Sequence, residues 1–204
     1  MTQPATRLAD PSGASIEDIF AAAGALRTGH FLLKSGRHSA RYLEKFAVLQ
    51  HPSLAVEIGR RLADGLAPYR PSLVAGPTTG GVLLAFETAR QLESRLGHGV
   101  RGIFAEPVDG GRALRRGWPI SADDRIVVVD DILTTGASLV ETIEAVRVAG
   151  GTPLAAAVIL DRSTRDVELG LPFVSLGRIE IESWDAGSCP RCAEGSRPEK
   201  PGSS

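Results

Sequence analysis

Two adjacent carboxylates, Asp130 and Asp131, stand at the end of an apolar run and are followed by a small, hydroxyl-rich turn over residues 134–138. Carboxylates suit the hydroxyls of a ribose or a hard cation such as Mg²⁺. A turn rich in backbone N–H groups at the start of a helix favours phosphate, because the helix dipole is positive there. One ligand that combines hydroxyls, a phosphate and a metal-binding group is a phosphorylated ribose.

The elements around these residues indicate how they are positioned. Residues 126–129 are four consecutive β-branched apolar residues, a pattern typical of a strand buried on both faces of a parallel sheet. Leu139, Ile143 and Val146 then recur with helical spacing. Open α/β sheets bind ligands at the carboxyl ends of their strands, where this turn would lie. The simpler alternative is a strand, turn and helix whose acids only cap the helix.

The thirteen residues 126–138 resemble the phosphoribosyl pyrophosphate (PRPP) motif of type I phosphoribosyltransferases: four hydrophobic residues, two acids, a variable pair and a Thr/Gly/Ser loop. The resemblance implies that the acids face the ribose hydroxyls, directly or through Mg²⁺, and that the loop holds the 5′-phosphate. It assigns to PRPP binding the residues Asp130, Asp131, Ile132, Leu133, Thr134, Thr135, Gly136, Ala137 and Ser138.

A second loop of small residues, over 76–81, also joins an expected strand to an expected helix. Taken alone, a Gly/Pro turn is usually only a turn. Beside the PRPP motif it resembles the pyrophosphate loop of the same superfamily, which implies that Thr78, Thr79 and Gly80 contact PRPP. Many members of the family have a lysine where this chain has Gly80.

Two further segments resemble orotate phosphoribosyltransferases. Lys34 begins a Lys-Ser-Gly turn after a short apolar stretch, and Arg162 lies in the run Leu-Asp-Arg-Ser at an expected strand end. The resemblance implies that Lys34, Thr134 and Arg162 bind orotate, and an arginine fork suits its carboxylate. A surface lysine and a surface ion pair are the alternatives. The resemblance covers nearly the whole chain and is closest to the shorter bacterial and archaeal branch.

The stretch over 106–117 corresponds to a mobile catalytic loop that in many members carries lysines and a histidine. Here it has neither, so we expect Arg115 and Arg116 to supply the positive charge for catalysis, with Arg112 nearby. A solvated β-hairpin with charged sides is the alternative interpretation of this stretch.

The resemblance therefore implies an enzyme that transfers the phosphoribosyl group of PRPP to orotate in pyrimidine biosynthesis, with Mg²⁺, as a cytoplasmic homodimer. Two alternatives remain: a transferase for a purine or uracil, and a non-catalytic PRPP-sensing regulator. Lys34 and Arg162 argue against a neutral purine. The segment before Ser15 is too short for a DNA-binding domain, and a formal net charge of -1 gives no basic field for nucleic acid.

At 204 residues, the chain can form one domain with a full core. No apolar run approaches the ~18 residues of a membrane span, and the first residues lack the apolar core of a signal peptide. We therefore expect no membrane partner.

Alternating strands and helices predict an α/β fold of the type I phosphoribosyltransferase kind, with a mainly parallel sheet flanked by helices and a small N-terminal hood. The single domain of residues 1–204 would comprise a hood over about 15–50, a core over about 51–182 and an irregular tail over about 183–204. Expected helices cover 15–26, 53–66 and 82–96, besides the motif helix; expected strands cover 31–33, 41–46, 72–76, 101–105, 126–129, 154–160 and 173–176.

The only two cysteines, Cys189 and Cys192, have the spacing of half a zinc knuckle. A structural zinc site needs four ligands, and the histidines, at positions 30, 38, 51 and 98, all lie far upstream. A dimer could pool two cysteine pairs, but buried or free thiols are the favoured interpretation.

Overall fold

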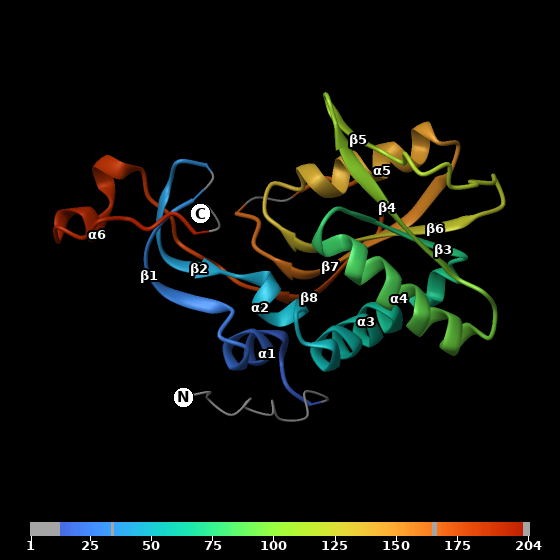
Figure 1. Cartoon of the computed structure of the whole chain (residues 1–204), viewed down its shortest axis with the longest axis horizontal. Helices are drawn as coiled ribbons and strands as arrows, with labels where there is room; N and C mark the ends of the chain where they lie inside the picture. Colours follow the sequence, from blue (N-terminus) through green and yellow to red (C-terminus); the bar gives the residue numbers. More distant parts are fainter. Residues whose placement is uncertain (1–12, 34, 165–166, 202–204) are drawn as a thin grey trace.

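The computed structural model describes residues 13–33, 35–164 and 167–201, so Lys34 lies outside the described residues. A mainly parallel sheet with helices on both faces forms the larger part, and a two-stranded antiparallel hairpin lies to one side of it (Figure 1). The predicted fold class is confirmed.

The central sheet has the strand order β5-β4-β3-β6-β7-β8. Only β5 runs antiparallel to its neighbour among the described pairs. Strand β3 has β4 on one side and β6 on the other, so the loops after β3 and β6 leave in opposite directions; such a switch point is where open α/β sheets bind ligands. The strands are β3 (Leu73–Pro77), β4 (Arg101–Val108), β5 (Gly111–Ala113), β6 (Arg125–Leu133), β7 (Thr152–Asp161) and β8 (Phe173–Arg178).

Strand β6 is covered on both faces, as its sequence predicts. Residues 126–129 are fully buried, and alternate side chains enter two different hydrophobic clusters. Val127 and Val129 pack in the cluster that includes α3 (Pro52–Leu66) and α4 (Gly80–Leu96), whereas Ile126 and Val128 pack in the cluster that includes α5 (Ala137–Val148). This alternation follows from the two-residue repeat of a strand.

The helix boundaries differ from the expected ones for local reasons. The helix α1 (Ile16–Ala22) begins with a capping box of Ser15 and Asp18, but it ends before residue 26, where β1 begins. The helix expected over 53–66 begins one residue earlier: His51 is the N-cap of α3 and Pro52 is the first helical residue, because a proline's fixed φ and missing N–H suit that position. A short 3₁₀ turn, η1 (Ala67–Tyr69), follows α3.

The expected strand over 41–46 is wrong in its last residues. Strand β2 (His38–Leu43) ends early, and the five-residue helix α2 (Lys45–Leu49) begins instead. The carboxylate of Glu44 accepts a hydrogen bond from the backbone N–H of Phe46 at 3.1 Å, and this N-cap starts the helix. The change of element turns Lys45 toward the sheet.

The hood hairpin, which we define as β1 (Leu26–Leu32) and β2, is joined by the tail, residues 183–201. The tail contains the short elements η2 (Ala186–Ser188) and α6 (Pro190–Ala193). Trp184 exchanges two backbone hydrogen bonds of 2.8 Å with His38, and Glu199 accepts one of 2.7 Å from Leu32. Two edges of the hairpin are thus completed by residues from the other end of the sequence.

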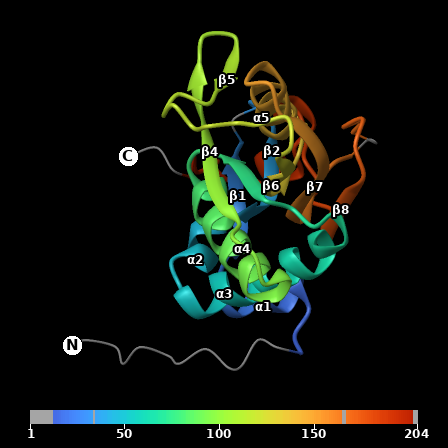
Figure 2. The ribbon, with the colours of Figure 1, turned by 90° about the vertical axis from the view of Figure 1, so that its right-hand side faces the viewer.

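Strand β4 runs three residues past its expected end and pairs with β5 as a hairpin, which projects beyond the helices (Figure 2). Asp109 and Gly110 form its turn, in which Gly110 has a φ of 84°.

Among the described residues, no helix combines the length and the apolar character that crossing a bilayer requires.

Candidate active site at the switch point of the sheet

The two acids of the motif lie at the carboxyl end of β6 and are almost fully buried, with Asp130 7% and Asp131 4% exposed. The backbone N–H of Asp131 donates to Asp130 Oδ1 at 2.7 Å, and that of Ile132 donates to Asp131 Oδ1 at 2.8 Å. Lys45 places its Nζ 2.6 Å from Asp131 Oδ2. Asp131 is therefore held in place by a salt bridge, whereas Asp130 forms no salt bridge with any described residue.

The surroundings of Asp130 favour its protonated form. Burial, and then the charge of Asp131, raise its pKa from the ordinary 3.8 to about 7, against smaller opposing effects of the hydrogen bond from Asp131 N–H, Lys45 and Arg112. Two carboxylates held this close resist being ionised together. A ligand cation or hydroxyl donor at this strand end would relieve the repulsion.

This pKa predicts a pH dependence of stability for the ligand-free protein. Between the pKa values of 3.8 and about 7, Asp130 is protonated in the folded state but ionised in the unfolded state. The contribution of Asp130 to the free energy of unfolding therefore falls as pH rises through that interval. In EDTA, Asp130→Asn should therefore raise Tm most at about pH 8, and the gain should shrink toward about pH 5. Thermal melts at several pH values measure this; a gain that does not vary with pH would contradict the assignment.

The loop over 134–138 forms the wall of a cavity of about 130 Å³. Gly136 is the N-cap of α5 with a φ of 81°, a conformation that glycine adopts without strain, and a Cβ there would lie 2.5 Å from Val167. The first N–H groups of a helix have no partner within the helix, so those of α5 are available to an anion. The lining residues are Asp130, Ile132, Leu133, Thr134, Thr135, Gly136, Ala137, Ser138, Leu139 and Val158.

The loop after β3 lies directly against the acid pair. A Cβ on Gly80 would collide with Asp131 Oδ2, so the residue that replaces the family's frequent lysine must be small here. The Thr78–Thr79 peptide bond is cis. Arg112, from β5, reaches over the loop: its Nη1 lies 3.3 Å from Thr78 Oγ1 and 3.4 Å from Thr78 O.

The two arginines expected to be catalytic lie farther out. Arg115 is exposed, and Arg116 donates to Glu106 at 2.7 Å. The guanidinium of Arg116 also lies 6.0 Å from the centre of the Phe104 ring. Of the three loop arginines, Arg112 is therefore the one that this arrangement brings to the loop after β3.

Arg162 follows the end of β7, beside the motif. Its backbone N–H donates to Leu133 O at 2.7 Å, and Asp161 Oδ1 accepts from Ser163 N–H at 2.8 Å and from its hydroxyl at 2.6 Å, which fixes the turn. The Nε of Arg162 is buried and has no hydrogen-bond partner among the described residues. Burial lowers the pKa of Arg162 from its ordinary value, with Tyr42 acting in the opposite direction, and arginine nonetheless stays charged at neutral pH.

Two residues near the site were not identified from the sequence. Burial raises the pKa of Tyr42, on β2, and the nearby charges of Lys45 and Arg162 are among those that oppose this effect. Lys45 holds Asp131, and its one available signal was rarity, since the chain has only three lysines. Both come from the hood side of the molecule, so the hood contributes to this end of the sheet.

The switch point thus brings together groups that can bind hydroxyls, phosphates and a carboxylate. A buried acid pair, a helix N-terminus beside a cavity, a loop of small residues and a half-buried arginine all lie at the carboxyl ends of β3, β6 and β7. Such a set can bind a sugar phosphate through hydroxyls and phosphates and present a second, carboxylate-bearing molecule to it.

Comparison with known proteins agrees with this geometry. The model of the phosphoribosyl transferase domain family matches residues 47–187. The chain is 41% identical over 186 residues to an orotate phosphoribosyltransferase of Caldanaerobacter subterraneus subsp. tengcongensis, covering 91% of this chain and 95% of the relative. It is 44% identical over 185 residues to one of Pelotomaculum thermopropionicum, covering 91% and 94%.

The fold is also similar to that of a solved orotate phosphoribosyltransferase from Mycobacterium tuberculosis. The TM-score is 0.68 at 24% identity, over 80% of this chain and 95% of that one. The family match covers most of the chain and the relatives are matched over nearly their whole length, so the chain belongs to the phosphoribosyltransferase family, among the orotate phosphoribosyltransferases.

Proposed function

We propose that this chain transfers the phosphoribosyl group of PRPP to orotate, giving orotidine 5′-monophosphate and pyrophosphate on the route to UMP. The observation that carries the proposal is the meeting of the acid pair, the two loops and Arg162 at one end of the sheet. The names of the relatives favour orotate over other bases.

PRPP would lie along the switch point. The loop over 134–138 would hold its 5′-phosphate through backbone N–H groups, supported by the cavity of about 130 Å³ beside it. Asp130 and Asp131 would accept hydrogen bonds from the ribose hydroxyls. Thr78, Thr79 and Gly80 would hold the pyrophosphate, and the position of Arg112 over Thr78 supports a cation there.

Orotate would stack beside the ribose, with its carboxylate on Arg162. The buried Nε of Arg162, which has no partner among the described residues, supports this role because a bidentate carboxylate would satisfy it. Thr134 belongs to the same proposed subsite. Lys34 is included on the resemblance alone, since it lies outside the described residues.

The acid pair also fits Mg²⁺. Mg²⁺ in proteins commonly uses one or two carboxylates together with substrate oxygens, and Asp130 and Asp131 place two adjacent carboxylates at this strand end. When bound with PRPP, the metal would neutralise charge on the leaving pyrophosphate. The chain's own residues would orient the two substrates and exclude water from the anomeric carbon while the β4–β5 hairpin closes.

The decisive experiment follows the ultraviolet absorbance of orotate with purified protein, PRPP and Mg²⁺. We expect orotate to be consumed only when both PRPP and Mg²⁺ are present. Adenine, hypoxanthine and uracil should not be consumed under the same conditions. Turnover of another base in place of orotate would favour the first alternative. Binding of PRPP without turnover of any base would favour a regulator.

Arg115 and Arg116 remain the proposed catalytic cations of the β4–β5 hairpin. Arg116 would have to leave Glu106 to reach pyrophosphate, so its charge would act only after closure. Charge supplied only on closure stabilises the transition state, so Arg115→Ala/Arg116→Ala should lower kcat by about tenfold or more with little change in PRPP affinity. Arg147→Ala, which removes an exposed arginine from α5, is the control; steady-state kinetics distinguishes the two, and loss of PRPP affinity alone would contradict the role.

We further propose a cytoplasmic homodimer of single-domain subunits, with hood, core and tail over about 15–50, 51–182 and 183–204, acting on small molecules and binding neither nucleic acid nor membranes. Mixing the Arg115→Ala/Arg116→Ala variant with an Asp130→Asn/Asp131→Asn variant tests whether subunits share sites. Recovered activity would mean that one subunit's hairpin serves its partner's acids. Without recovery, once subunit exchange is verified, each hairpin serves its own site.

A further inference from the structure

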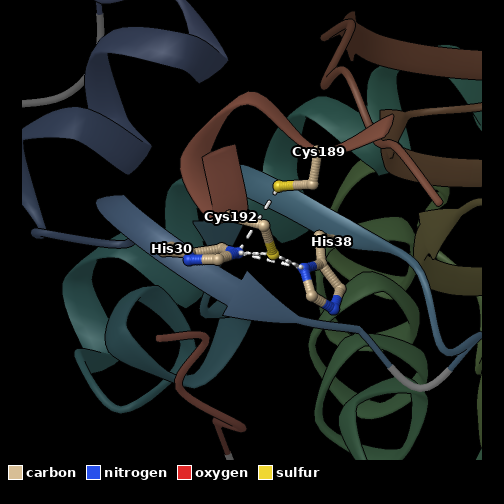
Figure 3. A group of neighbouring side chains, drawn as sticks. All are labelled: His30, His38, Cys189 and Cys192. Carbon is tan, nitrogen blue, oxygen red and sulfur yellow. Dashed lines mark hydrogen bonds between the residues drawn. The ribbon is translucent and has the colours of Figure 1, made fainter. Parts of the chain in front are cut away.

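Four side chains with metal-binding atoms meet between the hood hairpin and the tail, away from the switch point. His30 comes from β1 and His38 from β2, while Cys189 directly precedes α6 and Cys192 lies within it (Figure 3). One ligand atom of each lies within 4.8 Å of all the others. The long sequence separation between the histidines and the cysteines, which argued against a common site, is closed by the fold.

The distances within this cluster are close to those of a tetrahedral metal site. Bond lengths of about 2.3 Å to sulfur and 2.0–2.1 Å to nitrogen place tetrahedral ligand atoms about 3.3–3.8 Å apart. Here His30 Nε2 lies 3.0 Å from His38 Nδ1 and 3.5 Å from Cys189 Sγ. Cys192 Sγ lies 3.8 Å from His30 Nε2 and 3.3 Å from His38 Nδ1. A shift of a few tenths of an ångström would admit an ion.

The backbone and the outer contacts orient these ligands. Between the pairs Thr28–Arg41 and Phe31–Ser39, two residues of β1 face one of β2, a β-bulge that contains His30; bulges redirect side chains at functional sites. The other ring nitrogen of His30, Nδ1, lies 3.2 Å from Ser196 Oγ. A hydrogen bond there fixes the ring and leaves Nε2 free to bind a metal, the usual outer contact of a metal-bound histidine.

Three of the four side chains are also shielded from water, and Cys192 is partly exposed. His30 and His38 are each 7% exposed and Cys189 is 3% exposed. Both cysteines are free thiols. Two thiolates and two imidazoles in a closed tetrahedral arrangement are the donor set of structural zinc sites.

We propose that His30, His38, Cys189 and Cys192 bind one Zn²⁺ per chain, as a structural site that fastens the tail to the hood hairpin. The ion would connect β1, β2 and α6, three segments from the two ends of the sequence. It would be independent of the substrates and of Mg²⁺ at the acid pair.

The first test measures metal content. Protein expressed with added Zn²⁺ and purified under reducing conditions without chelators should contain about one zinc per chain by mass spectrometry. Cys192→Ser and His38→Gln should each lose most of it, while the control His98→Gln, at a partly exposed histidine outside the cluster, should retain it. No bound zinc in the wild type, or equal zinc in all variants, would overturn the proposal. One zinc per two chains would replace it with a site shared between subunits.

A second test does not depend on whether the variants fold. Metal-free wild-type protein titrated with Co²⁺ should develop the intense visible bands of tetrahedral Co²⁺ together with a thiolate-to-metal charge-transfer band. Both should saturate at one equivalent. Because the chain has only two cysteines, the charge-transfer band can come only from Cys189 or Cys192. Weak octahedral bands alone, or a thiol titration that finds a Cys189–Cys192 disulfide in the reduced preparation, would exclude the site.

A third measurement asks whether the ion fastens the tail. Removing zinc from the wild type should speed tryptic cleavage after Arg191 by about tenfold or more, because the tail then opens without global unfolding. Orotate turnover of the same samples reports the state of the switch point separately. Cleavage that is equally fast with and without zinc would leave the ion no structural role.

Discussion

Replacing Asp130 and Asp131 together with asparagine is expected to reduce the formation of orotidine 5′-monophosphate below detection. Each carboxylate would lose its charge-assisted contact with ribose or Mg²⁺, and such a contact contributes about 1.5–3 kcal/mol, or roughly tenfold or more in rate. The double variant should therefore lose at least about a hundredfold. Initial rates measured by orotate absorbance, at saturating PRPP and Mg²⁺, provide the test.

The matched control is Asp124→Asn, a change of the same kind just before the other end of β6. Asp124 accepts from Arg101 at 2.7 Å, and this pairing, with hydrogen bonds from Ser121 and Ser72, lowers its pKa against the raising effect of burial. That substitution should lower Tm and leave kcat unchanged. Near-native turnover by the Asp130→Asn/Asp131→Asn variant would remove the acid pair from the proposed mechanism. Circular dichroism of the Asp130→Asn/Asp131→Asn variant must show that it is folded, because the change at position 131 removes the carboxylate that pairs with Lys45.

Arg162→Ala should raise KM for orotate by roughly thirty- to a hundredfold, with a much smaller effect on KM for PRPP. The loss of a bidentate, charge-assisted pair with the orotate carboxylate corresponds to about 2–3 kcal/mol. Arg162→Lys should recover only part of the loss, since an ammonium group cannot form the fork. Steady-state kinetics with each substrate varied in turn separates the two constants.

Arg178→Ala is the control for this prediction. Arg178 is also a guanidinium at the carboxyl end of the sheet, with its Nη1 3.7 Å from Asp161 Oδ2, but its side chain is 57% exposed. Its removal should change neither KM appreciably. If Arg162→Ala instead weakened PRPP and orotate equally, the carboxylate would have to bind elsewhere.

The sequence predicted those parts of the site that depend on one local pattern. The strand 126–129, its acids and the turn after them are contiguous, and apolar burial on both faces needs only four neighbouring residues. Arg162 was identified from the resemblance of its segment to orotate phosphoribosyltransferases, and that segment is also contiguous, at the end of an apolar strand. Such features are encoded within about ten residues, over which periodicity is informative.

The features that were missed depend on contacts between distant segments. Lys45 lies 2.6 Å from Asp131 and belongs to a helix that a capping carboxylate starts, where the sequence had predicted a strand. His30 and Cys189 are 159 residues apart, and no local pattern relates them. The resemblance to a family identified the activity, whereas the hood-to-tail cluster became visible only in three dimensions.

The pairing of the hood hairpin with the tail also sets the order in which the parts can form during synthesis. Arg37 and its partner Ser183 are 146 residues apart, so a ribosome adding about 5–20 residues per second makes them roughly 7–30 s apart. An isolated two-stranded hairpin is only marginally stable. The first strands to be translated are therefore the last to be secured, after every strand of the central sheet has been made.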